Sequence, residues 1–181
     1  LSCAEIQRCL DDRTVLVSLY SGSSDPGETT VYATAFTRER VRLYRTVQAP
    51  AAEESRPGGA DPGAGRGAVA RLVHRARAAL SLQVPRGEIA SAAARLVLAD
   101  CFRALFGKLG KDLQGLSNVG KDHLCIVPHG PLHYIPFHLL GIKEPLASKW
   151  KVSYLPNLHL LAGLRNRSAL GAKRHDWITS I

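Results

Sequence analysis

The sequence predicts an α/β fold in which an antiparallel meander comes first, helices come second, and a buried strand comes after them. Three observations predict it. Residues 14–47 contain alternating, β-branched segments, residues 69–109 carry apolar side chains at helical spacing, and Leu124–Val127 is a continuous apolar run. The chain has 181 residues, of which 45% are hydrophobic and 22% charged. This length and composition are those of a globular protein that can bury a core.

The first segment predicts a helix and a strand. Ser2 and Glu5 have the spacing of a capping box, which favours a short helix through Leu10. Thr14–Tyr20 alternates between apolar and polar positions and is predicted to be a strand. We expect Ser21–Glu28 to be a turn, because it is rich in Ser, Asp, Pro and Gly.

Two more strands complete the predicted meander. Thr30–Thr37 and Val41–Val47 are rich in strand-forming residues, and Arg38–Arg40 is expected to connect them tightly. Because side chains alternate across a strand, Val41 and Leu43 should lie on one face and Arg42 and Tyr44 on the other. We therefore assign residues 1–48 to an N-terminal helix and meander.

Residues 49–67 are dense in Pro, Gly and Ala and contain few large apolar side chains. Such a composition predicts a flexible loop, because little apolar area is available to offset the cost of ordering. The loop separates the meander from residues 68–181, which we expect to hold a helical pair and further α/β structure. The sequence has no internal repeat.

Two helices are predicted after this loop. Apolar residues at helical spacing indicate one helix from Val69 to Leu80 and a longer one from Ile89 to Leu109. Gly107 and Gly110 are candidates for its end, and Gln114–Gly120 is expected to be a polar loop.

The most informative segment is the strand Leu124–Val127 together with the residues after it. The strand leads into Pro128-His129-Gly130, a predicted turn, and then into a Leu-x-x-Ile-Pro-Phe segment that is expected to turn into a helix. Beyond a turn at Gly141–Pro145, a strand is predicted at Trp150–Leu155, and Pro156 is suited to open a last helix. The residues that define this pattern are Pro128, Gly130, Leu132, Ile135, Pro136, Phe137 and Leu140.

This segment resembles the opening of the CHAT domain, a caspase-like and separase-like peptidase domain that is often attached to tetratricopeptide repeats. The resemblance is specific over residues 122–164 and weak in the N-terminal third. It implies that residues 68–181 contain the first strands of a caspase-like three-layer α/β/α sandwich. In that family the catalytic His and Cys come later in the chain, so the resemblance implies a truncated domain that supports a Cys–His dyad beyond Ile181. The absence of Met and the abrupt end at Ile181 likewise suggest an excerpt of a longer protein.

Within the chain, His129 and Cys125 are the only catalytic candidates, and we favour a structural interpretation of both. His129 next to Gly130 resembles a catalytic His-Gly pair, but its surroundings match an earlier strand of the family. Cys125 is expected to be a buried, inert thiol. Four residues of extended chain would separate the two by more than about 10 Å, too far for proton transfer. We therefore assign no catalytic residue and expect this chain alone to hydrolyse no peptide. The alternative is a non-catalytic scaffold or protein-interaction module with the same fold.

Metal and cofactor sites are also not expected. Cys125, His129, His133 and His138 could suggest zinc, but Gly130-Pro131 interrupts the helix that would align His129 with His133. No glycine-rich phosphate loop is present, and Ser153 and Ser168 lack the surroundings of a nucleophilic serine. Cys3, Cys9, Cys101 and Cys125 form no CxxC pair, so reduced thiols and a cytoplasmic location are the expectation.

The charge of the chain is uneven. Residues 1–67 carry a net charge of −1 and residues 68–181 one of +10. The basic residues are spread along the helices without a block of five or six, so nucleic acid is not the expected partner. No apolar run is long enough to span a membrane. The expected partners are a protein or peptide substrate of the parent enzyme and a tetratricopeptide-repeat segment of the same parent.

Overall fold

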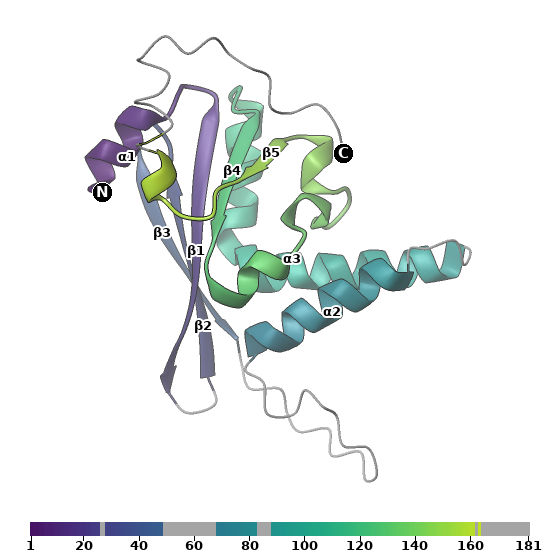
Figure 1. The fold of residues 1–181 in the computed structure, drawn as a ribbon. Coiled ribbons are helices and arrows are strands. Elements are labelled where there is room, and N and C mark those ends of the chain that lie inside the picture. The colour runs from purple at the N-terminus through teal and green to yellow at the C-terminus, as the bar shows by residue number, and fades with distance from the viewer. Residues whose placement is uncertain (26–27, 49–67, 83–87, 162, 164–181) are drawn as a thin grey trace.

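The protein is a mixed α/β structure built on a five-stranded sheet (Figure 1). The computed structural model describes residues 1–25, 28–48, 68–82, 88–161 and 163. Within these ranges the strand order is β3-β2-β1-β4-β5. The predicted α/β class is therefore confirmed in its general form.

The chain starts with α1 (Cys3–Cys9), and the predicted capping box is present. The Ser2 hydroxyl accepts a hydrogen bond from the backbone N–H of Glu5 at 3.3 Å, and the Glu5 carboxylate accepts one from the backbone N–H of Ser2 at 2.7 Å. These two bonds satisfy amides that have no partner inside the helix. The helix places Ile6 and the following Leu10 against the sheet.

The meander consists of β1 (Thr14–Asp25), β2 (Glu28–Phe36) and β3 (Val41–Gln48), paired antiparallel as predicted. The turn predicted over Ser21–Glu28 is much shorter than predicted, because β1 continues to Asp25 and the antiparallel strand β2 begins at Glu28. Ser21 pairs with Val31 and Gly22 with Thr30, and a register shift comes after them. Pairing with β2 keeps these small polar residues extended, although their local preference is for turns.

The last two strands are β4 (His123–Pro128) and β5 (Lys151–Tyr154), which run parallel to β1. Thr14 of β1 pairs with His123 of β4, and Cys125 pairs with Ser153 of β5. The meander and the C-terminal strands therefore form one continuous sheet. As predicted for a central strand, β4 has a strand on each side and buried residues from Leu124 to Pro128.

The two faces of the sheet are covered unequally. One face packs on α2 (Ala68–Leu82) and α3 (Glu88–Asn118) and carries the larger apolar cluster, to which β4 contributes Leu124 and Ile126. The other face carries a smaller cluster that includes Cys125 and Val127 of β4 and residues of α1. Figure 1 shows α2 and α3 together on one side of the sheet and α1 apart from them.

Helix α3 is longer than the sequence predicted. Gly107 interrupts it with φ 45° and ψ −119°, but the helix continues to Asn118, so the prediction of a loop over Gln114–Gly120 was wrong. The reason is that Leu113 is buried and Leu116 packs on the same cluster, which extends the apolar face of the helix. Gly107 therefore produces a kink, consistent with a conformation that only glycine adopts readily.

The segment after β4 packs as short 3₁₀ turns, η1 (Gly130–Tyr134) and η2 (Phe137–Leu139), where a helix was expected. Four apolar side chains of this segment enter the larger cluster, and each is at most 2% exposed: Leu132, Ile135, Phe137 and Leu140. A third turn, η3 (Leu146–Ser148), precedes β5. The prolines of this segment break a regular helix, and the short turns let its apolar residues reach the core.

The predicted last helix does not open at Pro156. A helical turn begins at His159, and the Asn157 side chain accepts a hydrogen bond from the backbone N–H of Leu160 at 3.2 Å. Asn157 caps this helical turn better than Pro156 could, because the Asn side chain supplies a hydrogen-bond acceptor for a free backbone N–H.

The loop predicted at residues 49–67 lies outside the described residues. In the part of the chain that the structure describes, none of the helices combines the length and the apolar character needed to cross a membrane.

Candidate functional site

The first sequence candidate, His129, lies at the carboxyl end of β4 and is exposed. Its backbone is extended, with φ −122° and ψ 140°, and it precedes the turn at Gly130. Its ring lies 4.8 Å from the ring of Tyr20, measured between centroids, with a tilt of 41°. Tyr20 belongs to the neighbouring strand β1 and follows Leu19, which pairs with Pro128, so this contact lies just beyond the last residue pair of the β1–β4 ladder.

The second candidate, Cys125, is buried in the smaller apolar cluster. Burial raises the pKa of its thiol, and a hydrogen bond with Ser153 opposes that rise in part. A thiol in this state is a weak nucleophile at neutral pH. Cys125 contacts Ser153 and His129 contacts Tyr20, so each side chain of the candidate dyad has a different partner.

A histidine that the sequence analysis did not single out connects the three parallel strands. His123, the first residue of β4, lies with Nε2 2.8 Å from the Ser153 hydroxyl of β5 and with Nδ1 3.1 Å from the Thr14 hydroxyl of β1. The Thr14 hydroxyl in turn hydrogen-bonds the carboxylate of Asp11, and this bond holds the pKa of that carboxyl below its ordinary value.

One assignment of protons satisfies this whole chain of groups. While the Cys125 thiol is protonated and leaves the Ser153 proton free, Thr14 donates to Asp11, the Nδ1–H of His123 donates to Thr14, and the Ser153 hydroxyl donates to Nε2. The arrangement resembles a serine activated by a histidine. Ser153, however, lies within β5 opposite Cys125 and lines neither of the two cavities described below. We therefore interpret these hydrogen bonds as a structural network that holds β1, β4 and β5 in register.

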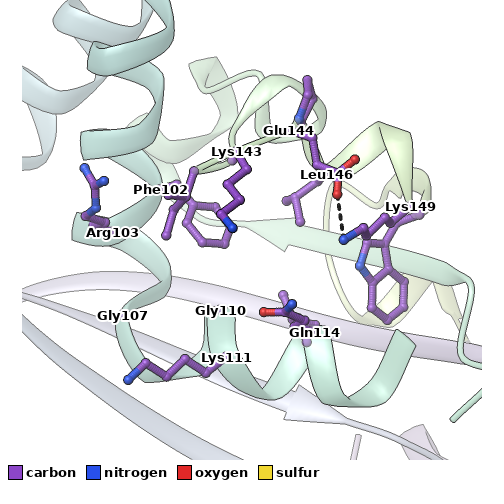
Figure 2. A pocket seen from close by; sticks show the side chains of 15 residues that line it. Phe102, Arg103, Gly107, Gly110, Lys111, Gln114, Lys143, Glu144, Leu146 and Lys149 are labelled. Atoms are coloured by element: carbon purple, nitrogen blue, oxygen red, sulfur yellow. Dashed lines mark ion pairs between the residues drawn. The ribbon is translucent and has the colours of Figure 1, made fainter. Parts of the chain in front are cut away.

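A cavity with a mainly apolar lining lies elsewhere, between α3 and the loop that leads from η2 to β5 (Figure 2). Its volume is about 520 Å³. Apolar lining comes from both elements: Phe102, Leu113, Ile142, Leu146 and Trp150. The kink in α3 contributes to its shape, because Gly107 and Gly110 line the wall on the helix side.

Charged side chains surround this apolar lining. Arg103, Lys111, Lys143 and Lys149 line the cavity together with a single acidic residue, Glu144. Glu144 pairs with Lys149 at 2.6 Å, and this bond lowers the pKa of the Glu144 carboxyl. Arg103 pairs with Asp100 at 2.7 Å. The cavity therefore combines an apolar interior with a basic rim.

A second cavity lies between β3 and the end of α3 and is centred on an ionisable group. The Tyr44 hydroxyl donates to the Asp112 carboxylate at 2.6 Å, and Arg42 pairs with the same carboxylate at 2.8 Å. Burial raises the pKa of Tyr44 to about 12, and the bond from Tyr44 lowers that of Asp112. Because Tyr44 of β3 and Asp112 of α3 are hydrogen-bonded to each other, this contact holds β3 against α3.

Three further histidines among the described residues are His133, His138 and His159. His133 and His159 are exposed, and His138 lies 2.9 Å, through Nδ1, from the Tyr154 hydroxyl. Across the described ranges, no group of three or more His, Cys, Asp or Glu side chains is arranged to hold a metal ion.

Comparison with known proteins leaves the family of the chain open. No protein-family model matches the sequence, and no curated protein matches it.

The sequence analysis missed both the His123 network and the apolar cavity. The pattern of residues along the chain indicates the network and the cavity only weakly. Thr14, His123 and Ser153 are far apart in the chain and meet only because β1, β4 and β5 are neighbours. A polar residue within each strand was the only available indication.

Proposed function

We propose that the chain is the N-terminal part of a CHAT-like, caspase-like cysteine peptidase domain. In this proposal it supplies supporting strands and helices of a three-layer α/β/α sandwich, and residues outside the chain supply the Cys–His dyad. The substrate of the parent would be a protein or peptide, and a tetratricopeptide-repeat segment of the parent would be its neighbour.

The observation that carries the proposal is the burial of the motif on which the resemblance depends. Leu132, Ile135, Phe137 and Leu140 are all in the core and join β4 to the helices. This burial supports an architectural role for the segment. The parallel order β1-β4-β5 agrees with it, because catalytic groups of open parallel sheets lie at the carboxyl ends of neighbouring strands.

The state of Cys125 supports a dyad located elsewhere. A peptidase of this kind needs a thiolate, an imidazole within hydrogen-bond reach and donors for the oxyanion. Cys125 is buried with a raised thiol pKa, whereas His129 is exposed and packs on Tyr20. In the proposal, the turn that contains His129 shapes the rim of the sheet without transferring protons.

A thiol-directed peptide probe tests this proposal. The chain and its full-length parent are incubated with a panel of peptidyl acyloxymethyl ketones, and labelled cysteines are mapped by mass spectrometry. We expect selective labelling of a cysteine outside residues 1–181 in the parent and only background labelling of the chain.

Two variants make the result interpretable. Cys125→Ser should leave labelling of the parent unchanged. Selective labelling of Cys125 that His129→Ala abolishes would overturn the proposal and make Pro128-His129-Gly130 a catalytic turn. A parent that remains unlabelled would favour the scaffold alternative, in which the same fold binds proteins without cleaving them.

A further inference from the structure

The cavity between α3 and the 141–150 loop has the size and composition of a small-molecule site. Its volume of about 520 Å³ falls within the range of about 300–1,000 Å³ that is typical of such sites. Phe102 and Trp150 provide aromatic surface, and Leu113 and Leu146 provide aliphatic surface. The cavity has room for an organic group the size of one or two aromatic rings.

The cations around the cavity differ in whether they are already paired. Lys149 is bound to Glu144, and Arg103 is bound to Asp100. For Lys111 and Lys143, by contrast, the structure shows no acidic partner among the described residues. In Figure 2, Lys143 extends from the loop toward α3, and Gln114 extends from α3 into the same space.

This combination selects for a ligand with two parts. An apolar body would be drawn into the cavity by the hydrophobic effect. An anionic head would meet the ammonium group of Lys143 and the side-chain amide of Gln114 (Figure 2). A neutral ligand would gain no charge pairing with Lys143, and a cation would be repelled.

We propose that this cavity binds a hydrophobic carboxylate, with its aromatic or branched aliphatic body beside Phe102 and Trp150 and its carboxylate at Lys143. The carboxylate can belong to a free small molecule or to the C-terminal residue of a peptide. The site is independent of the proposed peptidase dyad, because none of its lining residues belongs to the Pro128–Leu140 motif.

Titration calorimetry with 2-naphthoate, and with its neutral isostere 2-naphthamide, tests the proposal. We expect saturable binding of one 2-naphthoate per chain and at least about tenfold weaker binding of the amide. A hexapeptide ending in a Phe carboxylate and the same peptide with a C-terminal amide distinguish the two sources. Preference for the free peptide acid over 2-naphthoate assigns the site to chain ends, and the reverse assigns it to small molecules.

Three substitutions test the role of the charges. Lys143→Gln should weaken 2-naphthoate binding by about fivefold, as expected for an exposed charge pair. Lys108→Gln is the matched control, because Lys108 is an exposed lysine of α3 that does not line the cavity. Glu144→Gln should strengthen binding by about twofold, because it releases Lys149 from its ion pair.

The comparison of Lys143→Gln with Lys108→Gln separates a binding site from general electrostatic attraction, because both variants lose one positive charge on an exposed side chain but only Lys143 lines the cavity. Equal binding of the acid and the amide would overturn the proposal. So would equal effects of Lys143→Gln and Lys108→Gln, or the absence of saturable binding. Circular dichroism of each variant confirms that the fold is retained.

Discussion

Replacing Phe137 by Ala should destabilise the protein more than any change on its surface. Phe137 is fully buried, and its ring lies 5.9 Å from that of Phe106 in an edge-to-face arrangement and 6.4 Å from that of Tyr154. Loss of the buried apolar surface costs about 1.5–3 kcal/mol. The cavity that remains brings the total to about 3–5 kcal/mol. This is a large fraction of the roughly 5–15 kcal/mol by which domains are stable.

Urea unfolding measures this effect directly. With a slope of about 2 kcal/mol per molar urea, the midpoint should fall by about 1.5–2.5 M. Phe137→Leu keeps most of the apolar volume and should cost less than about 1.5 kcal/mol. His133→Ala, an exposed change in the preceding turn, should stay within about 0.5 kcal/mol of the original protein. If Phe137→Ala matches His133→Ala, the packing described for this motif is wrong.

Three other substitutions have defined outcomes in the same assay. Ser2→Ala removes the acceptor for the Glu5 amide and should cost about 0.5–2 kcal/mol; an unchanged midpoint would show that the capping box contributes nothing. Gly141→Ala places a methyl group against the carbonyl of Glu144 and should cost about 1–3 kcal/mol, whereas Ala147→Gly in the same loop should cost less; equal losses would refute the close approach. Tyr44→Phe removes the bond to Asp112 and should cost about 1 kcal/mol at neutral pH. Because that bond lowers the pKa of Asp112, its stabilisation is present above the ordinary carboxyl pKa and is lost as pH falls through the lowered one, so the two proteins should converge in acid; a constant difference down to pH ~2 would contradict this.

The elements that the sequence predicted correctly are those whose signals are local. The capping box of Ser2 and Glu5 acts within one helical turn, and the structure contains it. The apolar run from Leu124 to Val127 indicated a strand covered on both faces, and β4 has that environment. Burial of Cys125 was also predicted and is confirmed.

The errors occurred where tertiary contacts override a local preference. Ser21–Asp25 has turn composition, but pairing with β2 keeps it extended. Gln114–Asn118 looks like a polar loop, but burial of Leu113 and packing of Leu116 extend the helix through it. In the first case the deciding partner is the next strand of the hairpin, and in the second it is the apolar core; the local composition of the segment reveals neither.

The order of strands and helices, the buried character of β4 and the apolar character of the motif after it can be predicted from the residues alone. Which side chains meet depends on how the elements pack. Thr14, His123 and Ser153 form one network because three parallel strands lie side by side. The cavity exists because the kinked α3 faces the 141–150 loop. Such juxtapositions depend on how elements pack, and packing depends on the three-dimensional fit of side chains that are distant in sequence.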